Sequence, residues 1–291
     1  MTKRWSIGKI KRNGGDGVFV TAGNITLAVD VVGDGPRPMV FLHGWLMSKE
    51  SWAPLLPHLS WHDYRAYLVD VRGFGASAKP PSGYAIEDYA RDTIRLIRRL
   101  NIAPVVLVGH SFGGAGSLFV AAKLRHYLDA LIVMDTFPGG AAPSSAGRTR
   151  HHLERVQQLL NRTPESKRMQ VLNRIWLQAF YQKPDDRAMV LQDQASRAIL
   201  PHVLEQTIHT NLTTDIERLL PHIQCPTLVI RGKYDRMLAP GDDPLKKIPH
   251  AEFAIIPDAG HYPMIEQPKL VSAAMENFLQ RHSQRVDKPW R

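Results

Sequence analysis

Gly109-His110-Ser111-Phe112-Gly113 decides the fold, because it fits the pattern G-x-S-x-G and stands between two different kinds of sequence. The residues before it, 104–108 (PVVLV), are apolar and mostly β-branched, which predicts a buried strand. The residues after it, 113–123, are first small and then apolar, which predicts a helix packed closely on a sheet. A serine on a tight turn from strand to helix presents its hydroxyl outward. The stretch therefore predicts a nucleophile elbow with Ser111 as the nucleophile.

Strands and helices alternate around this elbow, which predicts the α/β class. Two apolar runs joined by Gly23-Asn24 predict a hairpin. Amphipathic helical stripes, such as the one in residues 86–97, lie between several of the later strands. Such alternation predicts a mostly parallel sheet covered by helices on both faces. Besides the elbow strand, we expect strands at residues 18–21, 25–32, 39–42, 65–70, 130–135, 227–230 and 252–256.

The alternation stops in the middle of the chain. A small-residue stretch at 137–145 (FPGGAAPSS) predicts a loop or hinge, and the segments from about residue 149 to 219 all have helical periodicity. We therefore expect three parts: a first part of the α/β core (1–137), a helical cap insertion (138–219) and a second part of the core (220–291).

A serine nucleophile needs a base and a group that orients this base. Of the 13 histidines, His261 has the most suitable context, because it follows the last predicted strand in the loop Pro257-Asp258-Ala259-Gly260-His261. Asp235 follows the strand at 227–230 and is the expected orienting acid. Asp135, which follows an earlier strand, is its rival. The carboxyl ends of parallel strands form the edge at which open α/β sheets bind ligands.

The oxyanion hole needs two N–H donors. We expect one from the backbone of Phe112, the residue after the nucleophile, and the other from Trp45, with Leu46 as the fallback. His43 and His110 are expected to have structural roles. The adjacent His151 and His152 do not share a helix face, so a metal site there is not expected.

Composition excludes several classes of protein. Cys225 is the single cysteine, so no intrachain disulfide or multi-cysteine metal site can form. The net charge is +10, but the basic residues are spread along the chain without a nucleic-acid-binding motif, which predicts a solvated basic surface. The N-terminus has no apolar signal segment, and no run is long enough to span a membrane. Cytoplasmic localisation is the resulting expectation.

These motifs together resemble the α/β-hydrolase superfamily. The matching residues follow the order of that family, with the serine first, the acid next and the histidine last. The resemblance covers residues 25–279 and implies an eight-stranded, mostly parallel sheet with a helical cap after the sixth strand. The matching motifs are His43-Gly44-Trp45, residues 70–77 (DVRGFGAS), residues 109–114, the turn 232–235 and Gly260-His261.

The chemistry that follows is a serine esterase with a Ser-His-Asp triad. We expect Ser111, His261 and Asp235 to cleave a small carboxylic ester or a lactone through an acyl-enzyme, with no metal and no organic cofactor. The elbow serine argues against dehalogenases and epoxide hydrolases, which use a carboxylate there. Perhydrolases (cofactor-free haloperoxidases), hydrolases that cleave carbon–carbon bonds of ring-fission products, and a small-ligand receptor on a hydrolase frame remain alternatives.

Substrate preference is expected to depend on the cap. Trp176, Phe180 and Tyr181 could line an apolar pocket, although such a helical stripe also fits core packing. The oligomeric state does not follow from the sequence.

Overall fold

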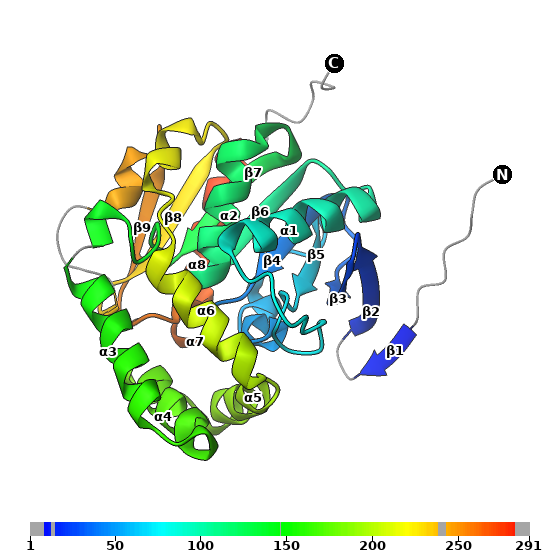
Figure 1. Cartoon of the computed structure of the whole chain (residues 1–291). Helices are drawn as coiled ribbons and strands as arrows, with labels where there is room; N and C mark the ends of the chain where they lie inside the picture. Colours follow the sequence, from blue (N-terminus) through cyan, green and yellow to red (C-terminus); the bar gives the residue numbers. More distant parts are fainter. Residues whose placement is uncertain (1–8, 13–14, 146, 238–242, 283–291) are drawn as a thin grey trace.

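The computed structural model describes residues 9–12, 15–145, 147–237 and 243–282 (Figure 1). Residues 1–8, which contain most of the segment examined for a signal, lie outside this part.

A single sheet forms the centre of the described chain, with the strand order β1-β2-β3-β5-β4-β6-β7-β8-β9. Its first pairings, β1 with β2, β2 with β3 and β3 with β5, are antiparallel, and all later ones are parallel. The eight predicted strands correspond to β2 through β9, and β1 adds a short ninth strand at the edge. The bounds are β1 (Lys9–Arg12), β2 (Gly15–Ala22), β3 (Ile25–Val32), β4 (Arg37–Leu42), β5 (Tyr64–Val69), β6 (Val105–His110), β7 (Leu128–Met134), β8 (Thr227–Gly232) and β9 (Glu252–Ile256).

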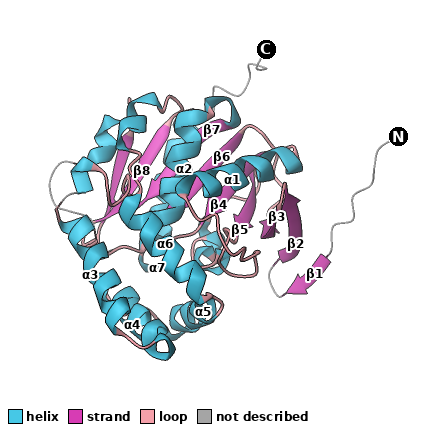
Figure 2. Cartoon of the chain, in the orientation of Figure 1, coloured by secondary structure: helices cyan, strands magenta, loops and turns pink. Residues whose placement is uncertain are grey.

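Helices cover both faces of the sheet (Figure 2). The α-helices are α1 (Ile86–Leu100), α2 (Ser111–Lys123), α3 (Arg148–Arg162), α4 (Glu165–Gln178), α5 (Asp186–Arg197), α6 (Pro201–Thr213), α7 (Pro263–Glu266) and α8 (Pro268–His282). The 3-10 helices are η1 (Lys49–Trp52), η2 (Leu56–His58), η3 (Arg125–Tyr127), η4 (Pro143–Ser145), η5 (Glu217–His222) and η6 (Pro244–Lys247).

Side chains alternate between two hydrophobic cores, one on each face of the sheet. Along β4, Val40 packs in the core that contains α1 and α2, whereas Phe41 packs with Trp52 of η1 in the core that contains α8. Both residues are fully buried. This burial on both faces explains why the central strands have nearly continuous apolar sequences.

The helical insertion α3 to α6 lies between β7 and β8, as the change of pattern predicts. Figure 1 shows α3, α4 and α5 together at one end of the molecule, with α6 between them and the sheet. Its two chain ends are joined by backbone hydrogen bonds, from Gly140 N–H to the Asn211 carbonyl at 2.8 Å and from Ile216 N–H to the Pro138 carbonyl at 2.9 Å. The domain boundaries 138 and 219 stay a prediction.

The motif at residues 70–77 builds the loop between β5 and α1. The buried Asp70 carboxylate accepts backbone N–H groups from Lys49 at 2.8 Å and Ala76 at 2.9 Å. Arg72 binds Asp92 of α1 through two hydrogen bonds, of 2.5 and 2.8 Å. The motif therefore fixes the loop that follows the carboxyl end of β5.

Candidate active site

Ser111 is the first residue of α2 and follows β6 directly, with a φ angle of +48°. Residues other than glycine rarely adopt this left-handed conformation, which is typical of a strained functional turn. A Cβ atom on Gly109 would lie 2.4 Å from Ser117 Oγ, and one on Gly113 would lie 2.4 Å from the His43 carbonyl oxygen. These two glycines let α2 approach the sheet closely enough for the turn to form.

Ser111, His261 and Asp235 form one hydrogen-bonded chain. His261 Nε2 lies 3.0 Å from Ser111 Oγ, and His261 Nδ1 lies 2.8 Å from Asp235 Oδ2. The side chains of His261 and Asp235 are 2% and 4% exposed, so water competes little for these bonds. Because an ionised carboxylate only accepts, Nδ1 carries the proton and Nε2 can accept the proton of the serine hydroxyl. The structure thus brings together the three residues predicted as nucleophile, base and acid.

Asp235 is held by its own loop as well as by His261. The backbone N–H of Met237 donates to its Oδ1 atom at 2.8 Å. Burial alone would raise the pKa of Asp235. The charge and hydrogen bond of His261, the Met237 N–H and the neighbouring Asp135 outweigh that effect and leave the pKa lowered, so Asp235 is ionised.

Asp135, the predicted rival acid, lies beside Asp235 rather than beside His261. It follows β7, the strand next to β8, and its carboxyl oxygens accept the Gly232 N–H at 3.0 and 3.3 Å. Burial, followed by the charge of Asp235, raises the pKa of Asp135 well above its ordinary value. The geometry assigns the contact with His261 to Asp235.

The two amides predicted for the oxyanion hole lie in suitable local structures. Phe112 is the second residue of α2, where the helix leaves its N–H groups unpaired. Trp45 lies in the turn after β4, which is closed by a hydrogen bond from Met47 N–H to the Gly44 carbonyl at 3.3 Å. No acceptor for either amide occurs within the described ranges. Leu46, the fallback donor, has a φ angle of +63° in the same turn.

Helices α5 and α6 of the insertion are hydrogen-bonded to the turn that contains Trp45 and Leu46. The Trp45 indole N–H donates to Thr207 Oγ1 of α6 at 2.8 Å, and Gln192 of α5 donates to the Leu46 carbonyl oxygen at 3.2 Å. A change in the position of α5 or α6 would therefore be transmitted to the turn that carries Trp45.

His43 and His110 are both fully buried and hold loops in place. The Val71 N–H donates to His43 Nε2 at 3.1 Å, so the proton of His43 is on Nδ1, which donates to the Gly44 carbonyl at 2.8 Å. His110 Nε2 donates to the backbone carbonyl of His261 at 2.7 Å. A Cβ atom on Gly44 would lie 2.5 Å from His110 Nδ1, so the close approach of the His110 ring to the backbone at position 44 requires glycine there. Burial lowers the pKa of both rings, that of His110 to about 3.

The predicted pocket residues lie near the His261 loop in two different settings. Trp176 and Phe180 are each 4% exposed and pack on each other and on Tyr262, with ring centroids 4.6 to 5.5 Å apart. Tyr181 stacks on Tyr234 at 4.2 Å and is partly exposed. The backbone N–H of His261 donates to the carbonyl of Ala179, just beyond α4, at 2.9 Å. The pocket role of these aromatic residues stays a prediction.

His152 of α3 is a polar residue near the triad to which the sequence assigned no role. Its Nε2 atom is buried and has no hydrogen-bond partner among the described residues. Nearby on the same helix, Thr149 Oγ1 donates to the carbonyl of Met237, two residues beyond Asp235, at 3.1 Å. The pKa of His152 is lowered, first by burial and then by the charge of His261, so the ring is neutral. The only signal in the sequence is that adjacent helical residues do not share a face, so the two histidines have different surroundings.

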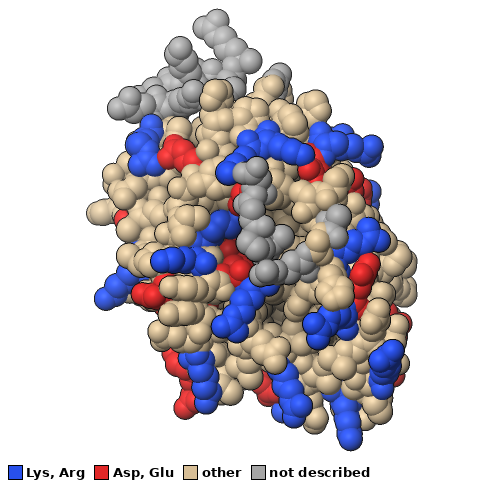
Figure 3. Space-filling view, turned by 90° about the vertical axis from the view of Figure 1, so that its left-hand side faces the viewer, with Lys and Arg blue, Asp and Glu red and all other residues tan. Residues whose placement is uncertain are grey.

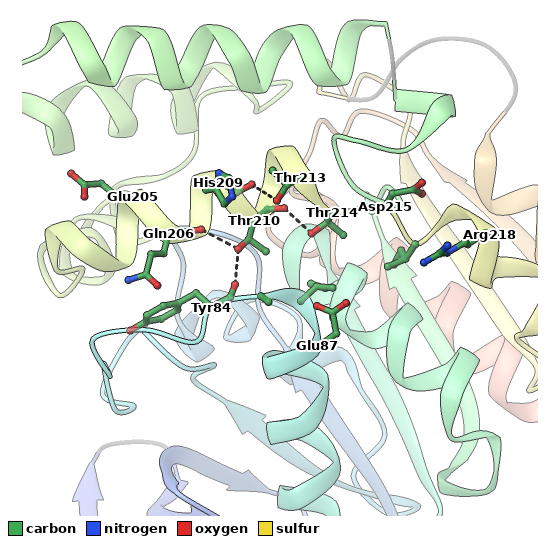
Figure 4. Close-up of a pocket in the computed structure, with 13 residues that line it drawn as sticks. Tyr84, Glu87, Glu205, Gln206, His209, Thr210, Thr213, Thr214, Asp215 and Arg218 are labelled. Atoms are coloured by element: carbon green, nitrogen blue, oxygen red, sulfur yellow. Dashed lines mark hydrogen bonds between the residues drawn. The ribbon is translucent and has the colours of Figure 1, made fainter.

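A separate cavity of about 710 Å³ lies between the start of α1 and helix α6 (Figure 4). Its walls carry acidic and basic side chains, including Glu87, His209 and Arg218, and Thr210 Oγ1 donates to the Tyr84 carbonyl there at 2.7 Å. None of the three triad residues lines this cavity.

Figure 3 shows Lys and Arg spread over one face among acidic and uncharged residues, without a continuous basic stripe. Within the described ranges, no group of three or more His, Cys, Asp or Glu side chains is arranged to hold a metal ion. The helices described are all too short or too polar to cross a membrane.

Comparison with known proteins gives concordant matches. The model of the "Alpha/beta hydrolase family" matches residues 39–274. A 2-(acetamidomethylene)succinate hydrolase of Mesorhizobium japonicum is 29% identical, over 89% of this chain and 94% of its own. A 2-hydroxy-6-oxo-6-(2'-aminophenyl)hexa-2,4-dienoic acid hydrolase of Metapseudomonas resinovorans is also 29% identical, over 91% of each chain. Among solved structures, a thermophilic esterase of Thermogutta terrifontis is similar, with a TM-score of 0.71 and 26% identity over 96% of this chain and 99% of its own.

Proposed function

The chain belongs to the alpha/beta hydrolase family and is an enzyme with hydrolase activity, and from this premise we propose that it cleaves small carboxylic esters or lactones through an acyl-enzyme on Ser111. The hydrogen-bonded chain from Ser111 through His261 to Asp235 is the observation that carries the proposal. The likeness to an esterase of known structure supports the choice of ester as the substrate class.

Acylation begins when Ser111 Oγ attacks the carbonyl carbon of the ester. His261 Nε2 takes the hydroxyl proton as the new C–O bond forms, and Asp235 stabilises the imidazolium across the 2.8 Å hydrogen bond. The N–H groups of Phe112 and Trp45 bind the oxyanion of the tetrahedral intermediate. The intermediate collapses as the C–O bond to the alcohol breaks, and the imidazolium returns its proton to the departing alcohol oxygen.

Deacylation repeats these steps with water. His261 takes a proton from the water molecule as its oxygen attacks the acyl carbon. The second intermediate expels Ser111 Oγ, which recovers its proton from His261, and the carboxylic acid leaves. Every proton in the cycle passes through Nε2 of His261, so these steps use neither a metal ion nor an organic cofactor.

Cleavage of a carbon–carbon bond by the same residues is the second candidate. It is favoured by the likeness to the dienoic acid hydrolase of Metapseudomonas resinovorans, which extends over 91% of this chain. In that case the leaving group departs as a carbanion and takes the proton of the imidazolium at carbon instead of at oxygen. The haloperoxidase-like alternative ranks lower, because the matching non-heme haloperoxidase of Mycobacterium phage D29 aligns with only 42% of this chain. The receptor alternative is set aside because the matched relatives are enzymes.

A fluorophosphonate probe tests the nucleophile directly. Ser111 Oγ should displace fluoride at phosphorus, form a P–O bond and abolish aryl ester hydrolysis. Ser111→Ala should remove both the labelling and the hydrolysis, with a loss of roughly 10⁴-fold or more in kcat. Ser117→Ala is the matched control, because this buried serine on α2 donates only to the Gly113 carbonyl.

Two outcomes would contradict the proposal. Labelling of another serine with full loss of activity would show that Ser111 is not the nucleophile. Turnover of a ring-fission dienoic acid with no turnover of any aryl ester would instead support the second candidate.

A further inference from the structure

Asp135 is a buried carboxyl group that the mechanism above does not use. It follows β7 directly, has a φ angle of +42° and is 0% exposed. Its backbone N–H donates to the Ile230 carbonyl of the neighbouring strand at 3.0 Å, and its carboxyl oxygens accept the Gly232 N–H. The left-handed backbone and these bonds fix the carboxyl group at the turn that carries Asp235.

Gly232 joins Asp135 to Asp235, because its N–H donates to the Asp135 carboxyl group at 3.0 Å and its carbonyl accepts the Asp235 N–H at 3.2 Å. The two carboxyl groups are therefore neighbours, and each influences the pKa of the other. Two ionised carboxylates in contact and away from water repel each other strongly, whereas one shared proton converts the contact into a hydrogen bond. Asp235 has the stronger reason to stay ionised, because it already accepts bonds from His261 and from the Met237 N–H.

Arg231 of β8 is a positively charged group near Asp135. Its guanidinium favours an ionised Asp135, but it is bound to Asp243 through two hydrogen bonds, of 2.6 and 2.9 Å. Arg231 is therefore largely neutralised by a carboxylate of its own. Burial and the charge of Asp235 outweigh it and keep the pKa of Asp135 well above that of an ordinary aspartate.

We propose that Asp135 is a positioning residue that stays protonated at neutral pH and donates a hydrogen bond to the carboxylate of Asp235. Asp235 then receives three hydrogen bonds, from His261, Met237 and Asp135, and they fix the direction in which it faces the imidazole. The pair carries a single negative charge, which lies on the member in contact with His261. The inference rests on the proposed function, because it treats Asp235 as the acid of the triad.

Thermal unfolding as a function of pH tests the proton without any substrate. The folded protein keeps a proton that the unfolded chain releases above the ordinary aspartate pKa of about 4. The contribution of Asp135 to the stability of the wild type should therefore fall as the pH rises from that value towards the raised pKa of Asp135. In the Asp135→Asn variant, the amide donates the same hydrogen bond and does not titrate. We expect its melting temperature, relative to the wild type, to increase steadily with pH across this window.

Asp34→Asn is the matched control, because Asp34 is exposed on the turn after β3. Its difference from the wild type should stay constant with pH. A constant difference for Asp135→Asn as well would show that Asp135 is ionised in the folded protein, and the proposal would be overturned.

The rate of Ser111 labelling by the fluorophosphonate tests the positioning role. Asp135→Ala removes the donor and should slow labelling about tenfold at neutral pH, the equivalent of one hydrogen bond, whereas Asp135→Asn should recover most of that loss. The wild type should lose labelling rate at alkaline pH as Asp135 ionises, and Asp135→Asn should not. Equal rates in the two variants at every pH would contradict the role.

The two tests separate this inference from the proposed function. If the wild type is not labelled at Ser111, the proposed function fails, and the unfolding experiment still decides whether Asp135 holds a proton.

Discussion

His110, which precedes the proposed nucleophile, holds the proposed base: His110 Nε2 donates to the backbone carbonyl of His261 across 2.7 Å. This bond joins the end of β6 to the loop after β9, and the two bonded residues are 151 positions apart along the chain. The ring of His110 is fully buried, and this burial favours its neutral form.

Stability at acidic pH should depend on His110. Its pKa is lowered from 6.5 to about 3 in the folded protein, so the unfolded chain binds a proton that the folded protein does not. The contribution of the neutral His110 ring to stability is then lost as the pH falls below 6.5, by roughly 3 kcal/mol on reaching about pH 4. His110→Gln should show a smaller loss over this range, measured by urea unfolding at several pH values. His62→Gln, at an exposed site, is the control. An unchanged acid dependence in His110→Gln would contradict the prediction.

Asp235→Asn should lower kcat about 10⁴-fold, because the amide cannot stabilise the imidazolium and favours the wrong tautomer of His261. Steady-state hydrolysis of an aryl ester measures this loss. Asp135→Asn is the comparison and should lower kcat by less than about tenfold, the value of one hydrogen bond. If Asp135→Asn were the more damaging change, the acid of the triad would lie after β7.

Trp176→Ala should change the preference among acyl groups if this side chain lines the pocket. Short acetyl esters should keep most of their kcat, while kcat/KM for bulky or aromatic acyl groups should change. Because Trp176 is 4% exposed, the variant should also lose about 3–5 kcal/mol of stability. Melting curves and a series of acyl lengths measure both effects. Leu159→Ala, at a residue 45% exposed on α3, controls for truncation in the insertion. An equal loss for all acyl lengths would leave Trp176 with a packing role only.

His152→Phe should raise KM more than it lowers kcat for substrates with a neutral hydrogen-bonding group. The unpartnered Nε2 atom of His152 can bind a substrate carbonyl or hydroxyl. Phenylalanine retains an aromatic ring at this position but cannot form that hydrogen bond. We expect KM to rise about tenfold for a hydroxylated ester and to stay nearly constant for its deoxy analogue. His151→Phe is the matched control, because the adjacent side chain is exposed. Equal effects on the two esters would exclude this contact.

The elbow and the positions of Asp235 and His261 beyond the ends of strands could be predicted because each depends on local sequence. Residues 109–113 combine a buried strand, a tight turn and a close-packed helix within a few positions. Asp235 and His261 both follow strands of a parallel sheet, whose carboxyl ends must share one edge. The short strand β1 was missed because its sequence, KIKR, has no apolar alternation over a useful length.

The partnership of Asp135 with Asp235 could not be predicted, although both residues were candidates. Each follows one of two strands that turn out to be neighbours, so both carboxyl groups reach the same place. Which of them meets His261 depends on the pairing of β7 with β8 and on the turn at Gly232. Similarly, the inward orientation of His152 depends on how α3 packs against the Met237 turn. Such contacts follow from tertiary register and have no short-range signal.

The hydrogen bond from His261 N–H to the Ala179 carbonyl fastens the insertion to the core at its middle as well as at its two ends. It divides the insertion into two segments, α3 with α4 and α5 with α6, each anchored on both sides. In recombination between relatives, either segment could be exchanged alone while residues 179–181 are kept. A chimera that replaced the whole insertion would also have to supply a carbonyl group that accepts the His261 N–H. Such an exchange would alter the insertion and the position of His261 together, so their effects on activity could not be separated.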